Sequence, residues 1–454
     1  MIYRLFQRLF FLPAWLLAGL SAFSQSPSAV HLVTLDPGHF HAALVQKSMY
    51  PQVDPVVRVY APAGTDVQLH LDRIGAYNKR ADNPTTWKEE VYTGPDFFEH
   101  MLKDKPGNVV VLAGNNRLKT EYIKRSLEGG LNVLADKPMV ISSAEFDNLK
   151  KAFTVASGRH LLLYDIMTER FEITTRLQRA LFMMQPVFGT LQKGTAEQPA
   201  VEMKSVHYFY KAVSGDILTR PAWFMDVEQQ GEGITDVTTH LVDLVQWECF
   251  PGQTLRYADV NITGARRWAT NMSLDEFKAI TKLDAFPPYL SKDLSGNQLK
   301  VYANGEINYM LKGVHAKVTA LWDYKAPEGS GDTHYSYLHG SKADLVIRQG
   351  AEQKYKPELY IEPRVNDAAF EQTLRRQLAS IQATYPGTDL VKTAKGWQLT
   401  IPDKYRDGHE AHFAAVTQNF LEYLQKHNMP AWEVPNMLTK YYTTTRALEM
   451  AKGK

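Results

Sequence analysis

The sequence predicts an α/β protein in two parts: a doubly wound parallel sheet, followed by an α+β domain with a large, mainly antiparallel sheet. Over residues 30–165, short apolar segments alternate with helical patterns, which is typical of parallel sheets with crossover helices. After residue 165, segments in which apolar and polar residues alternate become dominant, as in antiparallel sheets with one covered face. We therefore expect one domain over residues 30–165 and a second over residues 166–454.

The N-terminal residues predict export. Arg4 and Arg8 precede an apolar run over residues 9–20, and Ala22 and Ser24 supply small residues before a cleavage point at Gln25. This pattern is typical of a secretory signal peptide over residues 1–24, and the run is too short for a comfortable membrane span. We expect a periplasmic or otherwise exported protein.

Overall composition excludes several classes of protein. The 454 residues carry a formal net charge of only +2, which argues against a nucleic-acid surface. Cys249 is the single cysteine, so an intrachain disulfide framework and a cysteine-rich metal site are excluded. His409, Glu410 and His412 lack the i,i+4 histidine spacing of a zinc helix, and the sequence predicts no metal site.

The elements of the first domain follow from its apolar pattern. Five apolar, mostly β-branched segments are predicted strands, at residues 30–35, 56–60, 108–113, 132–135 and 160–164. Helical spacing predicts helices over residues 42–45, 95–102, 118–127 and 143–156. Right-handed crossovers would join these strands into one parallel sheet.

The second domain is expected to begin with a helix over residues 168–183. Period-two segments at residues 201–210, 300–311, 317–324 and 343–348 predict strands of the antiparallel sheet, and a helix is expected over residues 410–426.

A turn with a single glycine follows the first predicted strand. In a Rossmann-like domain, the backbone of this turn approaches the pyrophosphate of a dinucleotide through the pattern G-x-G-x-x-G. Here Asp36, Gly38 and His41 stand at the three glycine positions. The acid that would hold the ribose hydroxyls does not follow the second strand directly, and Asp66 is the nearest candidate. The alternative is a strand-to-helix turn that binds no ligand.

Two further stretches carry candidate chemistry. Asp136-Lys137-Pro138 follows a strand at the edge where doubly wound sheets bind ligands, so Lys137 could hydrogen-bond a substrate hydroxyl; a surface turn is the alternative. In the second domain, Thr235 is a plausible N-cap, and Asp236 and His240 stand one helical turn apart on one face. A carboxylate in that position can orient an imidazole and tune its basicity. A capping aspartate before an ordinary histidine is the alternative.

Together these stretches resemble the Gfo/Idh/MocA oxidoreductases, the family of glucose–fructose oxidoreductase and the inositol dehydrogenases. The resemblance rests on the glycine turn, on Asn115-Asn116 after a buried strand, on the run G-G-L-N-V-L-A-D-K-P that ends at Pro138, and on Asp236-x-x-x-His240. It covers residues 30–247 well, while the last two hundred residues resemble a diverged C-terminal domain of the family. Asp136 stands where the family usually has glutamate.

The resemblance implies hydride transfer between a nicotinamide cofactor, NAD or NADP with NAD favoured, and a sugar, polyol or glycoside hydroxyl. His240 would be the general base, Lys137 would polarise the same oxygen, and Asp236 would steer the histidine or a neighbouring hydroxyl. The implied cofactor-binding residues are Gly38, His39, Phe40, Asn115, Asn116, Asp136, Lys137 and Pro138.

Export shapes the expected cofactor use, because no pool of free nicotinamide cofactor is maintained outside the cytoplasm. We expect a tightly held cofactor and a small carbohydrate substrate in a monomer or modest homo-oligomer. Two alternatives stay open: a redox-neutral, NAD-dependent glycoside-cleaving enzyme that acts through a keto-sugar, and a sugar-binding or scaffold protein that has lost the cofactor.

Overall fold

The computed structural model describes residues 30–213 and 216–453, and the predicted signal peptide lies outside these residues. The first domain holds six parallel strands in the spatial order β3-β2-β1-β4-β5-β6. They are β1 (Leu32–Leu35), β2 (Val56–Tyr60), β3 (Lys88–Tyr92), β4 (Val109–Leu112), β5 (Asn132–Asp136) and β6 (Leu163–Ile166). The predicted doubly wound sheet is confirmed: β1, β4 and β6 are fully buried, β2 and β5 are mostly buried, and β3 lies at the exposed edge.

The helices of this domain are α1 (His41–Val45), α2 (Thr65–Lys79), α3 (Phe97–Asp104), α4 (Lys119–Glu128) and α5 (Ser143–Gly158). The sequence did not predict α2 or β3. Strand β3 has the sequence KEEVY and lies at an exposed edge, so it carries no apolar run that would have revealed it.

The order in which the strands are added to the sheet reverses between β1 and β4, which are parallel neighbours, and this is where doubly wound sheets open a ligand crevice. The loops after these two strands are packed tightly against each other. A Cβ added to Gly114 would lie 1.8 Å from the carbonyl oxygen of Asp36, so only glycine fits after β4.

The second domain is built on a large sheet in the order β10-β12-β13-β7-β14-β15-β16-β18-β17. Its strands pair antiparallel except β7 with β13. They are β7 (Val201–Tyr210), β10 (Val260–Ser273), β12 (Gln298–Leu311), β13 (Val314–Lys325), β14 (Thr333–His339), β15 (Ala343–Arg348), β16 (Glu358–Pro363), β17 (Asp389–Thr393) and β18 (Gly396–Thr400), with the short β11 (Leu294–Ser295) beside β12. A separate hairpin joins β8 (Ala212–Val213) to β9 (Asp216–Ile217). The predicted mainly antiparallel sheet is confirmed.

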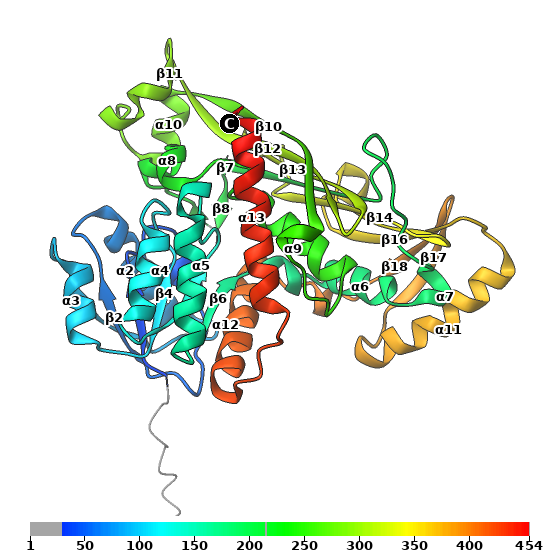
Figure 1. Ribbon diagram of the computed structural model, residues 1–454, viewed down its shortest axis with the longest axis horizontal. Coiled ribbons are helices and arrows are strands. Elements are labelled where there is room, and N and C mark those ends of the chain that lie inside the picture. The colour runs from blue at the N-terminus through cyan, green and yellow to red at the C-terminus, as the bar shows by residue number, and fades with distance from the viewer. Residues whose placement is uncertain (1–29, 214–215, 454) are drawn as a thin grey trace, which may run out of the picture.

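The helical elements that position the site are η1 (Thr168–Phe171), α6 (Ile173–Phe182), η2 (Ala222–Met225), α8 (Val227–Gln230), α9 (Thr238–Cys249), α12 (His409–Lys426) and α13 (Glu433–Ala451). Outside this set lie α7 (Gln185–Phe188), α10 (Leu274–Thr281) and α11 (Ala368–Thr384). Helix α13 lies between the two domains and contacts α5, α9 and β10 (Figure 1). Helix α12 contacts α1, β6 and η1, and Phe413 and Phe420 on α12 belong to the core of the first domain.

A buried ion network ties the two domains together. Arg170 contacts Asp243 at 2.6 Å and Glu433 at 2.9 Å, while Lys440 contacts Asp243 at 2.8 Å and Asp165 at 2.6 Å. Every charge in this set has an opposite charge as a neighbour, which burial requires. The network fixes α9 against β6 and α13, and α9 carries His240.

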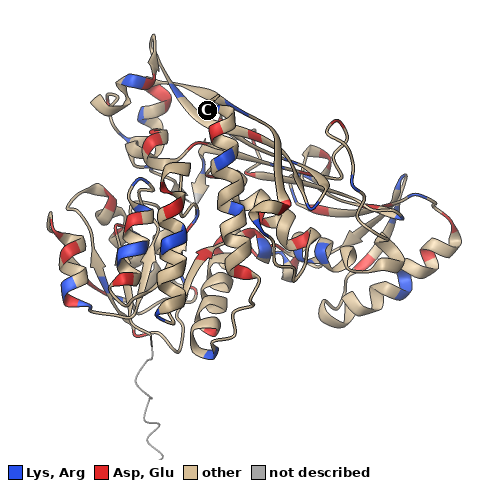
Figure 2. Cartoon of the chain, viewed as in Figure 1, with Lys and Arg blue, Asp and Glu red and all other residues tan. Residues whose placement is uncertain are grey.

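Charged residues of both signs are interspersed along the helices and strands seen in Figure 2. None of the helices in the described part of the chain is both long enough and apolar enough to cross a membrane.

Candidate active site

A cavity of about 1090 Å³ opens between the two domains at the carboxyl end of the parallel sheet. Both domains line it: His39 and Lys137 come from the first, and His207, Asp236 and His240 come from the second. A cavity of this size lined by convergent polar groups is typical of a small-molecule site. The structure therefore brings together the three side chains that the sequence singled out as catalytic.

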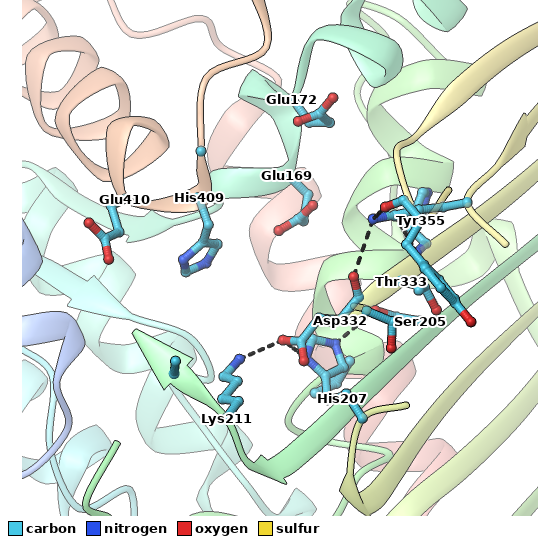
Figure 3. A pocket seen from close by; sticks show the side chains of 18 of the residues that line it. Glu169, Glu172, Ser205, His207, Lys211, Asp332, Thr333, Tyr355, His409 and Glu410 are labelled. Atoms are coloured by element: carbon cyan, nitrogen blue, oxygen red, sulfur yellow. Dashed lines mark hydrogen bonds and ion pairs between the residues drawn. The ribbon is translucent and has the colours of Figure 1, made fainter. Parts of the chain in front are cut away.

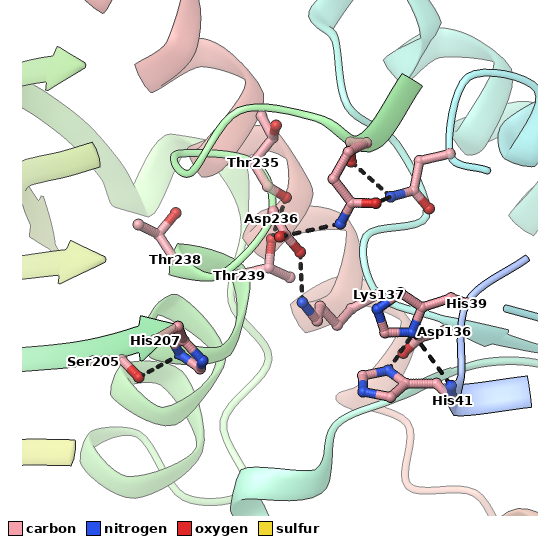
Figure 4. Close-up of polar contacts among 12 residues, drawn as sticks. His39, His41, Asp136, Lys137, Ser205, His207, Thr235, Asp236, Thr238 and Thr239 are labelled. Carbon is pink, nitrogen blue, oxygen red and sulfur yellow. Dashed lines mark hydrogen bonds and ion pairs between the residues drawn. The ribbon is translucent and has the colours of Figure 1, made fainter. Parts of the chain in front are cut away.

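The contact that crosses the cavity is an ion pair between Lys137 and Asp236. The Lys137 Nζ lies 2.5 Å from Asp236 Oδ1, and the Gln230 amide donates a 3.2 Å hydrogen bond to the other oxygen (Figure 4). Lys137 follows β5 and precedes a cis peptide bond to the buried Pro138. The ion pair holds the lysine ammonium at the junction of the domains.

His240 lies on the first turn of α9, on the cavity wall. Its Nδ1 has no hydrogen-bond partner among the described residues. Burial, and then the positive charge of Lys137, lower the pKa of His240 well below its usual value, so the imidazole is neutral near pH 7 and can accept a proton.

The predicted relation between Asp236 and His240 differs in the structure. Helix α9 begins at Thr238 with Val237 as N-cap, so Thr235 is not the cap and Asp236 lies in the preceding turn. Asp236 bonds Lys137 and Gln230, and no hydrogen bond joins it to His240 within the described chain. The helical spacing did not apply because α9 begins two residues later than an N-cap at Thr235 would place it.

A second polar wall lies on β7 and the loop before β14, and its residues Ser205, His207 and Asp332 were not predicted from the sequence. Ser205 Oγ lies 2.7 Å from His207 Nε2, and His207 Nδ1 lies 3.0 Å from Asp332, which also contacts Lys211 at 2.5 Å (Figure 3). Although burial acts to raise the pKa of Asp332, the charges of His207 and Lys211 hold it well below its usual range. The i,i+2 spacing of Ser205 and His207 on a predicted strand was a usable signal for one shared face.

The third side of the cavity carries Glu169 on η1 and His409 at the start of α12 (Figure 3). Burial, and then the negative charge of Glu172, raise the pKa of Glu169 to about 7. Burial lowers the pKa of His409 to about 3. The cavity thus holds a carboxyl group that can change protonation near neutral pH, which is a common property of active sites.

The glycine turn after β1 is covered by protein. A Cβ added to Gly38 would lie 2.9 Å from the Trp223 ring and 3.0 Å from the Asp66 carboxylate, and the Trp223 indole N–H donates a 2.7 Å hydrogen bond to Asp66. The cavity that borders Gly38 here has a volume of only about 10 Å³. The backbone N–H of Gly38 already bonds the Asp36 carbonyl at 2.8 Å, and that of His39 bonds the Ala113 carbonyl at 3.0 Å.

The loop after β4 is also engaged by the second domain. The Asn115 amide donates to the Gln229 side chain at 2.7 Å, and the Asn116 amide donates to the Gln230 carbonyl at 2.6 Å. Phe40 is buried beside the His39 and His41 rings in the core of the first domain. Residues 222–230, which form η2 and α8, thus cover the crevice where a dinucleotide would lie.

The structure therefore has space for one end of a nicotinamide dinucleotide but not for its pyrophosphate. The end beside Lys137 and His240 opens into the large cavity, whereas the pyrophosphate position over Gly38 is filled by an indole ring and a carboxylate. Asp36 adds a second carboxyl group there, and burial, followed by the charge of Asp66, raises its pKa to about 6. In this conformation the chain does not admit the whole dinucleotide.

Comparisons with known proteins identify both domains. Residues 58–162 match a family model described as "Oxidoreductase family, NAD-binding Rossmann fold", and residues 177–452 match one described as "Putative oxidoreductase C terminal domain". The chain is 56% identical to a solved structure described as a "putative oxidoreductase" from Parabacteroides merdae ATCC 43184, with a TM-score of 0.92 over 95% of this chain and 99% of that one.

More distant solved structures share the fold. A levoglucosan dehydrogenase in complex with NADH and levoglucosan has 12% identity and a TM-score of 0.59 over 93% of this chain and 97% of that one. A "putative myo-inositol dehydrogenase" from Sinorhizobium meliloti 1021 has 13% identity and a TM-score of 0.54 over 93% and 98%. No curated protein matches the chain.

Proposed function

Because the chain belongs to the Gfo/Idh/MocA family of oxidoreductases, we propose that it oxidises or reduces a carbon bearing a hydroxyl group in a sugar, polyol or glycoside. The observation that carries this proposal is the ion pair between Lys137 and Asp236 beside His240, in a cavity lined by both domains. A scaffold that only bound a sugar would have no need of both an imidazole and a lysine ammonium on the wall of one cavity. The family assignment that the sequence predicted is confirmed.

The residues of the chain supply the proton transfer of this reaction. The neutral His240 takes the proton of the substrate hydroxyl, and the Lys137 ammonium donates a hydrogen bond to the same oxygen as negative charge develops on it. Asp236 holds Lys137 in place and offsets part of its charge. A nicotinamide cofactor, with NAD favoured, supplies the hydride chemistry when bound.

The carbohydrate class is supported by the levoglucosan dehydrogenase, whose structure contains NADH and levoglucosan, and by the polar walls of the cavity. A second candidate is a sugar-binding protein without cofactor, which the covered glycine turn favours. A redox-neutral, NAD-dependent cleavage of glycosides is a variant of the first proposal, because it begins with the same proton transfer.

We further propose that the protein is exported, on the strength of the signal-peptide pattern over residues 1–24, and that it holds its cofactor tightly in a second conformation, in which Trp223 and Asp66 no longer cover Gly38. A modest homo-oligomer is compatible with this proposal.

The test begins with cofactor and then adds substrate. The purified protein is denatured by heat and the supernatant assayed for NAD(H) and NADP(H), and the refilled protein is assayed with free sugars, inositols and alkyl glycosides. His240→Asn is expected to lower kcat by at least about 100-fold while nucleotide binding persists, because general acid–base catalysis typically contributes 10²–10⁴-fold. His427→Asn, at an exposed position, is the matched control.

Two results would contradict the proposal. Absence of released nucleotide, together with no binding on titration of the wild type or of Trp223→Ala, would favour the binding-protein candidate. Full activity of His240→Asn would remove that imidazole from the mechanism.

A further inference from the structure

A cluster of two imidazoles and a carboxylate lies on the cavity wall next to Lys137. His39 lies in the turn after β1, His41 is the first residue of α1, and Asp136 is the last residue of β5. One possible ligand atom from each of the three lies within 4.8 Å of the other two (Figure 4). The tertiary fold makes this cluster, since 95 residues separate His41 from Asp136.

The three side chains of this cluster offer more hydrogen-bond acceptor atoms to one another than donor atoms. His39 Nδ1 accepts a hydrogen bond from the His41 backbone N–H at 3.3 Å, so this nitrogen carries a lone pair and no proton. The same nitrogen lies 3.8 Å from Asp136 Oδ2, which is too far for a hydrogen bond between them. Of the two imidazole rings, that of His41, whose Nδ1 lies 2.8 Å from Asp136 Oδ2, is the one close enough to donate a hydrogen bond to this oxygen.

Asp136 supplies an independent observation. Its side chain is only 5% exposed, and its Oδ1 is a buried atom without a hydrogen-bond partner among the described residues. Buried carboxylate oxygens normally have a donor or a cation beside them. The nearby lysines serve other groups, because Lys137 Nζ pairs with Asp236 and Lys119 Nζ bonds the backbone oxygen of Asp136 at 3.1 Å.

We propose that His39, His41 and Asp136 bind a divalent transition-metal ion of the Zn²⁺ class. Zinc–nitrogen and zinc–oxygen bonds of about 2.0–2.2 Å place neighbouring ligand atoms about 3–3.5 Å apart, and the observed separations of 2.8 and 3.8 Å lie on either side of that range. Two histidines and one carboxylate form the ligand set of open, catalytic sites. The ion takes the place of the proton on His41 Nδ1, so one proton is released on binding, and the 3.3 Å hydrogen bond from the His41 backbone N–H to His39 Nδ1 is broken so that this lone pair can bind the ion.

The open side of the site faces the large cavity, because His39 and His41 also line it. Remaining coordination positions are therefore available to water or to an oxygen of a substrate held near Lys137 and His240. A metal there would act as a Lewis acid on a hydroxyl or carbonyl oxygen, in addition to the proton transfer described above. Hydroxyl and carbonyl groups of carbohydrates are the class of ligand that this arrangement favours.

Metal binding is tested without cofactor or sugar, so its outcome is separate from that of the oxidoreductase proposal. The full chain, stripped with a chelator, is titrated with Zn²⁺ by calorimetry and with Co²⁺ by visible absorption. The expected result is one ion per chain, with Co²⁺ bands of a site that contains imidazole nitrogen rather than of the hydrated ion. Absence of stoichiometric binding to the wild type overturns the proposal, whatever the variants do.

The variants locate the site. His39→Ala and Asp136→Asn should each weaken Zn²⁺ binding by more than about 100-fold, because loss of a direct ligand exceeds the 10–100-fold typical of an outer partner. His427→Ala, at an exposed position, should bind as the wild type does. Binding that survives in both site variants overturns the proposal, and far-ultraviolet circular dichroism shows that each variant is folded.

Discussion

Replacing Asp36 by asparagine measures the cost of burying a carboxylate at the glycine turn. Asp36 has φ 49°, a left-handed conformation that asparagine adopts readily, so the substitution keeps the backbone. Burial, followed by repulsion from Asp66, raises its pKa from the ordinary 3.8 to about 6, while the charge of Lys119 acts in the opposite direction.

The expected magnitude follows from this shift. At 1.36 kcal/mol per pH unit, a change from 3.8 to about 6 makes the ionised form about 3 kcal/mol less stable in the folded protein than in the unfolded chain. Between these two pH values the folded state binds more protons than the unfolded state. The contribution of Asp36 to stability is thus fully present below pH 3.8 and is lost as the pH rises through about 6.

The assay is urea unfolding of the wild type and Asp36→Asn from pH 4 to pH 8. We expect the variant to be more stable by up to about 3 kcal/mol at pH 8, with the difference disappearing toward pH 4. Asp82→Asn, at an exposed position, should change stability by less than about 0.5 kcal/mol throughout. Equal stability of Asp36→Asn and wild type at pH 8 would refute the reasoning, because it would mean that the carboxylate is not desolvated.

Two further variants test the crevice and the domain contact. Trp223→Ala should bind NAD⁺ at least about 10-fold more tightly than the wild type by calorimetry, because it removes the ring over the glycine turn. The control Trp268→Ala should bind NAD⁺ as the wild type does. Equal or weaker binding by Trp223→Ala would show that the ring does not block the dinucleotide. Arg170→Met should lower the free energy of unfolding by about 3–5 kcal/mol, since it leaves Asp243 and Glu433 buried without their shared cation. A loss below about 1 kcal/mol in urea unfolding would contradict the conclusion that this network holds the two domains together.

The apolar pattern predicted most of the first sheet correctly. The strand at residues 56–60 is found as β2 with the same bounds, and the strands at residues 201–210 and 343–348 are found as β7 and β15. Buried strands can be predicted from the sequence because a packed sheet needs continuous or alternating apolar residues. Helix α13 was not predicted; it buries threonines and Lys440 as well as apolar residues, so no simple stripe marks it.

The sequence predicted which residues belong to the candidate site better than it predicted which of them are in contact. Lys137 and His240 line one cavity, as the resemblance implied, but Asp236 bonds the lysine rather than the histidine. The sequence spacing gave no means to decide this, because a two-residue difference in where α9 begins moves Asp236 off the helix.

The sequence by itself determined the two-part architecture and the family, and it named Lys137, Asp236 and His240 as candidate reactive side chains, because these inferences depend on local periodicity and on short motifs. The tertiary structure decided which groups meet: Trp223 and Asp66 over Gly38, and His39 and His41 around Asp136. Trp223 and Asp66 are 157 positions apart in the sequence, and His41 and Asp136 are 95 positions apart. These contacts depend on how the two domains and the loops at the sheet edge pack together. This packing cannot be predicted from local patterns in the sequence.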